Sequence, residues 1–260
     1  SRVAEGDGLR WRLSTYVPGD TFTEVSSDHR AFIGGQGLAQ FHRVMNRIDY
    51  TFKSQHPGHD TIGHLTRLIE ASENPSYRTS WDEISHRGMA IIEALSEALL
   101  PSQLPRQVVH GDPKISNLRF CDDQAIMIDL DTCNRHTRLV DLGDAVRSWC
   151  HRPKQPIGQR FSIDTWQALM KGYISEAHPL SPLEIEWLPK AGYLITLELA
   201  SRFTRDYLED HYFAYDKEAF PSRRAHNRYR MDTMWALAEE MKVATAKLSD
   251  FTNEILKKNT

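Results

Sequence analysis

Short apolar runs separated by polar residues occupy the middle of the chain and constrain its fold more than any other feature. The runs QVVH, NLRF and AIMID each predict a short strand, and CDDQ supplies turn residues between the last two. Asp112 follows the first run, Asn117 begins the second and Asp129 ends the third. Because these three residues lie at strand ends, we expect their side chains to converge on one point.

The chemistry of these side chains suits phosphoryl transfer with a divalent cation. Mg²⁺ prefers oxygen ligands from one or two carboxylates together with substrate phosphates, and the amide oxygen of Asn117 is an acceptable neutral ligand. Asp112 is then free to accept a proton from a hydroxyl group, and Lys114 places a positive charge beside the transferring phosphoryl group. The sequence therefore predicts Asp112 and Lys114 as catalytic residues, and Asn117 and Asp129 as metal ligands.

The pattern H-G-D-x-x-x-x-N followed by I-D-x-D resembles the aminoglycoside phosphotransferase and choline kinase branch of the protein-kinase-like fold. The resemblance implies an α+β fold, with a mainly helical C-terminal lobe and catalytic β-hairpins. It implies that Asp112 deprotonates the acceptor hydroxyl, that Asn117 and Asp129 hold Mg²⁺, and that ATP is the phosphate donor. It also implies that His110 braces the catalytic loop as a buried, hydrogen-bonded histidine.

A closer similarity lies downstream, where IDLDTCNRHTRLVDLGDAVRSWC is similar to the I-D-L-D-T…Y-D-F-G-D-x-x-R pattern of N-acetylhexosamine 1-kinases. WRLSTYVPGDTF, LAQFHRVM, HPGHDTIGHLTRL and LITLELASRFTRDYLEDHYF resemble segments of that subgroup in the same order. The similarity covers the chain from about Leu9 to the final helix. Two departures are that Leu142 replaces the aromatic residue of the pattern and that the loop reads H-G-D where these kinases often read H-N-D.

This similarity implies an acceptor site and its supporting residues. The expected acceptor is the anomeric hydroxyl of an N-acetylhexosamine, bound by Arg202, Tyr212 and Asp131, and Asp141 is expected to hydrogen-bond the backbone of the catalytic loop. For Arg202 the alternative is a salt bridge to a neighbouring carboxylate, because a buried arginine in a helix needs a partner. Asp144 and Arg147 are assigned to helix capping and surface pairing.

Kinases of this fold carry an N-terminal lobe with a glycine-rich loop and a lysine that hold the nucleotide phosphates. LRWRLSTYVPG corresponds to the end of that lobe and its hinge. We therefore expect residues 1–25 to be a remnant of the N-terminal lobe and hinge. Residues 26–260 are expected to form the helical catalytic lobe, with the catalytic loop at 108–131. A further small lobe is expected to be encoded upstream.

Helical periodicity predicts the remaining elements. A helix is expected after Ser26 or Ser27, with the closely spaced Gly34, Gly35 and Gly37 serving helix packing rather than a phosphate-binding loop. Short and long helices are expected at 62–71 and 80–100; the second is capped by Ser80, stopped by Pro101 and buries Ile84, Met89, Ile92 and Leu95. Three more are expected at 161–176, 182–208 and 222–258, with Pro189 kinking or dividing the second.

Composition excludes partners that are recognised by bulk charge. With 32 basic and 35 acidic residues the net charge is -3, which gives no general attraction to nucleic acid or to an anionic membrane. No run reaches the length of a membrane span. Three cysteines without C-x-x-C spacing are expected to be free thiols in a reducing cytosol, so a soluble cytoplasmic protein is expected, with its oligomeric state open.

Two alternatives to a sugar kinase stay open at this point. In the first alternative, the acceptor is an aminoglycoside, choline, homoserine or another hydroxyl compound. A cationic acceptor of this kind needs clustered carboxylates in its binding site. In the second alternative, the chain is a shortened, non-catalytic kinase-like module. A zinc site at His56, His59 and His64 is not expected, because no cysteine lies nearby.

Overall fold

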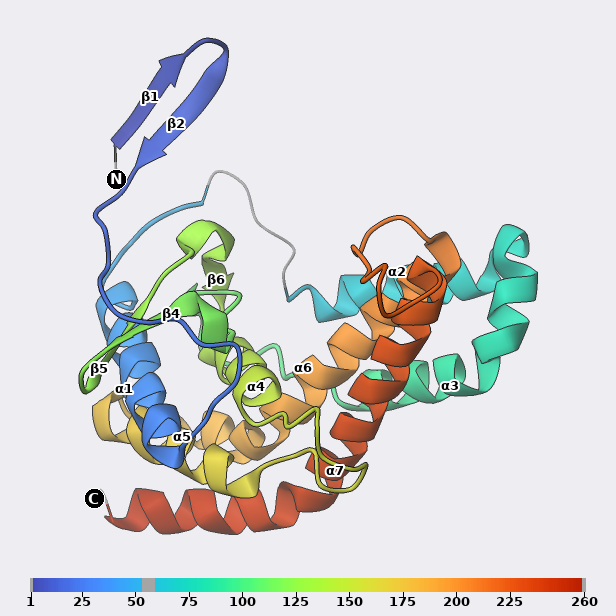
Figure 1. Ribbon diagram of the computed structural model, residues 1–260. Helices are drawn as coiled ribbons and strands as arrows, with labels where there is room; N and C mark the ends of the chain where they lie inside the picture. The colour runs from blue at the N-terminus through green and yellow to red at the C-terminus, as the bar shows by residue number, and fades with distance from the viewer. Residues whose placement is uncertain (1, 53–58, 259–260) are drawn as a thin grey trace.

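Helices form most of the protein, and short antiparallel strand pairs carry the predicted site (Figure 1). The computed structural model describes residues 2–52 and 59–258. The helices are α1 (Asp28–Met45), α2 (Thr61–Glu73), α3 (Arg78–Glu97), α4 (Arg138–Trp149), α5 (Ile163–Glu176), α6 (Pro182–Glu209) and α7 (Arg223–Lys258), with 3-10 turns η1 (Pro75–Tyr77), η2 (Ile115–Asn117) and η3 (Leu130–Thr132). The strands are β1 (Arg2–Gly6), β2 (Leu9–Leu13), β3 (Gln107–Val109), β4 (Leu118–Cys121), β5 (Gln124–Met127) and β6 (Asn134–His136). This is the mainly helical α+β class that the family resemblance implies.

The strands pair in twos and not in one larger sheet. β4 and β5 form the expected hairpin, in which Leu118 faces Met127 and Asp122 turns the chain with a positive φ of 50°. β3 pairs with β6, a three-residue strand that the sequence analysis missed because so short a run has no periodicity. The β1–β2 hairpin extends away from the helical body (Figure 1).

Helix α1 shows why its three glycines are needed. The helix is continuous from Asp28 and is capped by Ser27, whose hydroxyl accepts a hydrogen bond from the backbone of Arg30. A Cβ atom at Gly35 would lie 2.3 Å from the carbonyl oxygen of Leu169, and one at Gly37 would lie 2.3 Å from that of Ala125. The glycines therefore let α1 approach α5 and β5 closely, which confirms the packing interpretation.

Helix α3 differs from its prediction at both its start and its buried face. It begins at Arg78 directly after η1, so Ser80 is not its cap; Asn74 instead caps η1 through a hydrogen bond from the backbone of Ser76. Met89 is 56% exposed. It follows Ile84 by five residues, which at about 100° per residue places it roughly 140° around the helix from that side chain. The buried stripe instead comprises Trp81, Ile84, Gly88, Ile91, Ala94 and Leu95.

The three C-terminal helices lie within two residues of their predicted bounds. α6 begins with a capping box between Ser181 and Glu184 and runs without a break for 28 residues. Pro189 therefore does not divide it. A proline removes one backbone hydrogen bond, and the buried residues before and after Pro189 hold both halves of α6 against the neighbouring helices α4 and α7.

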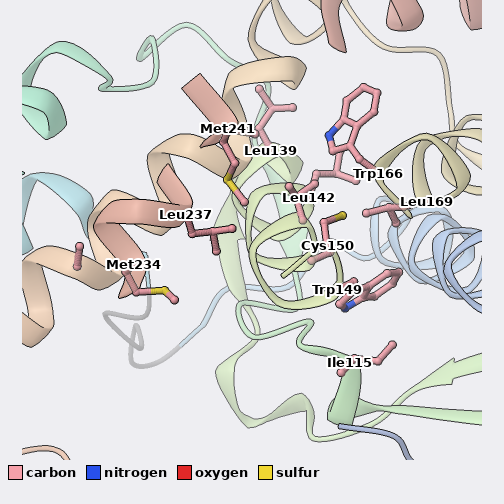
Figure 2. Close-up of a cluster of buried hydrophobic side chains, with 14 of the residues drawn as sticks. Ile115, Leu139, Leu142, Trp149, Cys150, Trp166, Leu169, Met234, Leu237 and Met241 are labelled. Carbon is pink, nitrogen blue, oxygen red and sulfur yellow. The ribbon is translucent and has the colours of Figure 1, made fainter. Parts of the chain in front are cut away.

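Helix α4 lies at the centre of the hydrophobic core and joins that core to the predicted site. Figure 2 shows Leu142, Trp149 and Cys150 among side chains of α5 and α7. The indole Nε1 of Trp149 donates a 2.9 Å hydrogen bond to the carbonyl oxygen of Pro113, which is in the predicted catalytic loop. Packing of the core thus fixes one side of the loop.

Two further expectations concern the described part of the chain. Within it, no helix has the length and apolarity needed to cross a membrane. Cys121, Cys133 and Cys150 are free thiols, as expected.

Candidate active site

The predicted catalytic loop turns sharply at Gly111 and is braced by His110. Gly111 has a positive φ of 83°, and a Cβ atom there would lie 2.4 Å from the carbonyl oxygen of Thr132. His110 is fully buried, and its Nε2 lies 2.8 Å from the carbonyl oxygen of Ile128 at the end of the β4–β5 hairpin. These contacts hold the loop after β3 against the segment that follows β5.

Asp141 on α4 also holds this loop in place. Its Oδ2 accepts a hydrogen bond from the backbone N–H of His110 at 2.6 Å, and its Oδ1 accepts one from Gly111 at 2.8 Å. Its Oδ2 also lies 2.9 Å from Nε2 of His42, whose Nδ1 lies 2.8 Å from the hydroxyl of Tyr173. Burial opposes ionisation of Asp141, but the hydrogen bond from His42 and those from the backbone outweigh it and lower its pKa. This is the backbone contact implied by the resemblance.

His42 was missed in the sequence analysis, although a signal was present. It lies on the buried face of α1 and is 3% exposed. A histidine within the apolar stripe of a helix needs a polar partner. The sequence shows that need but not the identity of the partner, which lies 99 residues away in the chain.

Asp112 is half-buried at the start of the site and has two polar neighbours. Nζ of Lys114 lies 2.6 Å from its Oδ2. The side-chain Nδ2 of Asn117 donates to the same Oδ2 at 3.1 Å and to the backbone carbonyl of Asp112 at 2.8 Å. The structure therefore brings Asp112, Lys114 and Asn117 together.

Asn117 and Asp129 lie on adjacent chain segments. The backbone N–H of Ile128 donates to the carbonyl oxygen of Asn117 at 2.9 Å, and Asp129 follows directly, exposed and with a left-handed φ of 62°. Because Nδ2 of Asn117 points to Asp112, its Oδ1 is left for another partner. No hydrogen bond to the Asp129 carboxylate is found within the described ranges. An amide oxygen and an unused carboxylate fit the oxygen donor set that Mg²⁺ prefers.

A cavity of about 330 Å³ opens beside Asp112. Its walls come from the catalytic loop, one face of α4, one face of α6 and the segments around His59 and Phe213. The residues that line it are His59, Gly111, Asp112, Lys114, Thr132, Asp144, Arg147, Ile195, Glu198, Leu199, Arg202 and Phe213. Its volume is in the range of sites for small molecules.

Arg202 lines this cavity, and its guanidinium lies near the rings of Phe213 and Tyr212. Cζ of Arg202 is 5.5 Å from the ring centroid of Phe213 and 5.9 Å from that of Tyr212. Phe213 lines the cavity; Tyr212 is 63% exposed and does not. Arg202 forms no ion pair with any residue that the structure describes, so the expected alternative, a salt bridge to a neighbouring carboxylate, is absent there.

Asp206 positions this aromatic pair and was not singled out in the sequence. Its carboxylate accepts hydrogen bonds from the backbone N–H groups of His211, Tyr212 and Phe213, at 3.1, 2.7 and 3.0 Å. Asn227 on α7 donates to it at 2.7 Å. Despite burial, these donors lower the pKa of Asp206. The turn after α6 is thereby held against Arg202.

Asp144 and Arg147 pair with each other, but not at the surface as expected. Oδ1 of Asp144 lies 2.7 Å from an Nη atom of Arg147. The Asp144 side chain is only 6% exposed, and its Oδ2 is buried without a hydrogen-bond partner among the described atoms. The spacing of three residues on α4 correctly suggested a pair. It could not show that this face of the helix is covered by α6.

His59 also lines the cavity and pairs with Glu198 of α6. Its Nδ1 lies 3.0 Å from Oε1 of Glu198, and the hydroxyl of Thr61 donates to Oε2. Burial opposes protonation of His59, yet the Glu198 carboxylate outweighs it and raises the pKa of the imidazole to about 9. His59 Nε2 is buried without a hydrogen-bond partner within the described part of the structure.

The remaining predicted residues lie farther from this cavity. Asp131 is exposed in η3, two residues after Asp129, and does not line it. Of the three histidines considered for zinc, His56 lies outside the described residues, His59 pairs with Glu198, and Nδ1 of His64 is 3.1 Å from Arg67. A larger cavity of about 530 Å³ shares His59 but includes none of the predicted site residues.

Comparison with known proteins relates this geometry to phosphotransferases. A family model described as the phosphotransferase enzyme family (APH) matches residues 2–169. A choline/ethanolamine kinase family protein from Mesorhizobium loti is 16% identical with a TM-score of 0.58, over 98% of this chain and 76% of that one.

Two further solved structures share the fold. An amicoumacin kinase in complex with AMP-PNP, Ca²⁺ and Ami is 18% identical with a TM-score of 0.52, over 84% of this chain and 63% of that one. An aminoglycoside phosphotransferase from Alicyclobacillus acidocaldarius is 13% identical with a TM-score of 0.52, over 97% and 74%. At these identities the similarity concerns the fold.

Proposed function

Because the chain belongs to the phosphotransferase enzyme family, we propose that it transfers the γ-phosphoryl group of ATP to a hydroxyl group of a neutral sugar. The observation that carries this proposal is the placement of Asp112 and Arg202 in the wall of one cavity. Asp112 supplies a carboxylate for the hydroxyl proton, and Arg202 supplies a cation that is not bound to a carboxylate of the described chain. The acceptor that we propose is an N-acetylhexosamine, at its anomeric hydroxyl.

Asp112 is the proposed general base. Its carboxylate accepts the proton of the acceptor hydroxyl as the oxygen attacks phosphorus, and the hydrogen bond from Asn117 keeps Oδ2 in position for this transfer. Lys114, 2.6 Å from the same oxygen, stabilises negative charge on the transferring group. Asn117 and Asp129 are the proposed ligands of Mg²⁺, which when bound would neutralise charge on the nucleotide phosphates.

The pattern of charges in the cavity favours a neutral acceptor over a cationic one. Three carboxylates line it, and each has a cationic neighbour: Lys114 for Asp112, Arg147 for Asp144 and His59 for Glu198. Arg202 is the remaining cation in this wall. An ammonium group would meet net repulsion, whereas the guanidinium fork can donate to two oxygens of a sugar.

The anomeric hydroxyl is the preferred acceptor on chemical grounds. It is more acidic than the other hydroxyls of a sugar, so a carboxylate removes its proton more easily. We assign the acetamido carbonyl or a ring hydroxyl to Arg202, and the apolar face of the pyranose to the aromatic pair of Tyr212 and Phe213. Asp131, which is exposed beyond Asp129, is proposed to contact the outer hydroxyls. We also propose a cytoplasmic location, where ATP is available.

One observation favours a second candidate, a kinase for a cationic alcohol. Asp112, Asp144 and Glu198 place three carboxylates around a cavity of about 330 Å³, and solved structures of the same fold include a choline/ethanolamine kinase family protein and an aminoglycoside phosphotransferase. A cationic acceptor would have to displace Lys114 or Arg147 from its carboxylate partner. This requirement makes it the weaker candidate.

The two candidates differ in a direct assay. The protein is incubated with ATP and Mg²⁺ and, separately, with N-acetylglucosamine, N-acetylgalactosamine, choline, ethanolamine and an aminoglycoside, and products are identified by ³¹P NMR. The proposal expects sugar 1-phosphates, recognised by their anomeric coupling. Phosphorylation of the cationic compounds alone would replace it with the second candidate.

A further inference from the structure

Two buried polar atoms in the wall of the acceptor cavity have no partner among the described residues: Nε2 of His59 and Oδ2 of Asp144. The side chain of His59 is 8% exposed and that of Asp144 is 6% exposed. Buried polar atoms in folded proteins are almost always hydrogen-bonded, and one that is not calls for a specific explanation. Both residues line the cavity that Asp112 also lines, so a ligand bound there is the candidate partner for the two atoms.

The His59 atom is a hydrogen-bond donor. Glu198 is an acceptor when ionised, so Nδ1 of His59 must carry the hydrogen of their 3.0 Å contact. The raised pKa, about 9, means that Nε2 also carries a hydrogen at neutral pH. A charged donor therefore lies in the wall of the cavity that His59 lines, while Thr61 and Glu198 fix the orientation of the imidazole.

The Asp144 atom is a hydrogen-bond acceptor. Oδ1 of Asp144 is occupied by Arg147, with contacts of 2.8 Å to Nε and 2.7 Å to an Nη atom. The second oxygen, Oδ2, is left for another donor. The negative charge of Asp144 also contributes to the raised pKa of His59, so the two side chains interact electrostatically.

We propose that His59 and Asp144 together recognise a hydroxyl group of the acceptor other than the one that is phosphorylated. A hydroxyl oxygen accepts the hydrogen of His59 Nε2, and its own hydrogen is donated to Asp144 Oδ2, so one neutral group satisfies both atoms. An ammonium group has no lone pair for His59, and a fully ionised carboxylate or phosphate has no hydrogen for Asp144. The pair therefore favours an acceptor that carries a second hydroxyl group.

This inference rests on the proposed function, because it takes the cavity beside Asp112 as the acceptor site. Its test combines two measurements on the full chain. The first is kcat/KM for N-acetylglucosamine and for its 3-, 4- and 6-deoxy analogues, in the wild type, His59→Gln, Asp144→Asn and His59→Gln/Glu198→Gln. The double variant leaves no unpaired buried carboxylate at residue 198 if His59→Gln alone misfolds.

In the wild type, one deoxy analogue is expected to lose about 10- to 100-fold in kcat/KM, the effect of removing a hydroxyl from a site built to bind it. In the His59 and Asp144 variants, the penalty for that same analogue is expected to shrink to less than about threefold. His29→Gln is the matched control, because His29 is exposed and pairs with Asp123 outside the cavity. Equal deoxy penalties in the wild type and in folded variants would overturn the proposal.

The second measurement does not depend on turnover. The imidazole ¹⁵N and ¹H signals of His59 are recorded by NMR with N-acetylglucosamine, with glycerol and with choline. Shifts with the polyols but not with choline support the proposal, whether or not a sugar is phosphorylated. Absence of sugar phosphorylation would reject only the proposed function. Sugar phosphorylation without any change at His59 would reject the role of His59 and Asp144 and leave the proposed function standing, and shifts with choline alone reject both.

Discussion

The side-chain amide of Asn117 donates a 3.1 Å hydrogen bond to Oδ2 of Asp112. The proposed metal ligand therefore also orients the proposed base. Two roles that the sequence assigned separately are joined in one contact, and this determines what the variants of each residue should show.

Replacing Asp112 by asparagine removes the base but keeps the size of the side chain. We expect Asp112→Asn to lower kcat by about 10²- to 10⁴-fold, the usual effect of general-base assistance, with little change in nucleotide affinity. Steady-state kinetics and calorimetric titration with AMP-PNP measure the two effects. Asp123→Asn, on the exposed β4–β5 turn, is the control. A variant that retains more than about a tenth of wild-type kcat would show that Asp112 is not the base.

The two proposed metal ligands should respond differently to excess Mg²⁺. Asn117→Ala and Asp129→Ala are both expected to raise the Mg²⁺ concentration needed for half-maximal activity. Saturating Mg²⁺ should restore kcat more fully in Asp129→Ala, because Asn117→Ala also loses the hydrogen bonds to Asp112. Activity titrations against Mg²⁺ at fixed ATP test this difference. Unchanged Mg²⁺ dependence in both variants would exclude them as ligands.

The sequence predicted those parts of the site that lie close together in the chain. Asp112, Lys114 and Asn117 fall within six residues, and a loop of that length brings its polar groups together whatever surrounds it. Helical periodicity likewise predicted α1, α5, α6 and α7. Local spacing in the sequence was sufficient to predict both the polar loop and these helices.

Contacts between distant segments could not be predicted in this way. His42 meets Asp141 across 99 residues, and His59 meets Glu198 across 139. Asp144 was placed at the surface because its own helix gives no sign that α6 covers it. Met89 was misplaced for a related reason, since a periodic run of apolar residues in α3 can be aligned on more than one face. Burial of these residues depends on tertiary packing.

Loss of the Asp141 carboxylate should destabilise the catalytic loop. Asp141→Asn would turn an amide N–H toward donors that need an acceptor, and we expect unfolding to become easier by about 2–4 kcal/mol. Because the pKa of Asp141 is lowered in the folded state, its contribution is present above the unfolded value of about 4 and is lost as pH falls below it. Urea unfolding at pH 7, with Asp123→Asn as control, measures the change. A loss below about 0.5 kcal/mol would contradict this role.

His59 should give the protein a pH-dependent stability of the opposite sign. Its folded pKa of about 9 lies above the unfolded value of about 6.5. Protonation therefore stabilises the fold fully below about pH 6.5, and this contribution is lost as pH rises to 9, by at most about 3 kcal/mol.

Urea unfolding of the wild type and of His59→Gln/Glu198→Gln between pH 6.5 and 9 isolates this term. The charged groups that raise the pKa of His59 are Glu198, Asp144 and Asp141, and His59 in turn lowers the pKa of the neighbouring His136. The double variant removes the buried pair as a unit, so its stability should decline less over this range. Parallel curves for the two proteins would mean that His59 does not change its protonation there.

Arg202 offers the most direct test of the acceptor class. Its guanidinium lies over Phe213 and Tyr212 and has no carboxylate partner within the described structure, so its loss leaves no buried negative charge behind. We expect Arg202→Ala to reduce kcat/KM for the sugar by about 1.5–3 kcal/mol in transition-state terms, the usual effect of losing a charge-assisted hydrogen bond, with ATP affinity nearly unchanged. Arg202→Lys keeps the charge but not the bidentate fork, so its kcat/KM for the sugar should fall between those of the wild type and Arg202→Ala.

Arg87→Ala is the matched control for this series. Arg87 also lies over an aromatic ring, 4.9 Å from the centroid of Trp235, and pairs with Asp232 away from the acceptor cavity. It should leave kcat/KM for every acceptor close to the wild-type value. If the second candidate were correct, Arg202→Ala would instead remove a repulsive charge and improve the use of choline or an aminoglycoside. The direction of the change on neutral and cationic acceptors, measured side by side, therefore decides between the two proposed substrate classes.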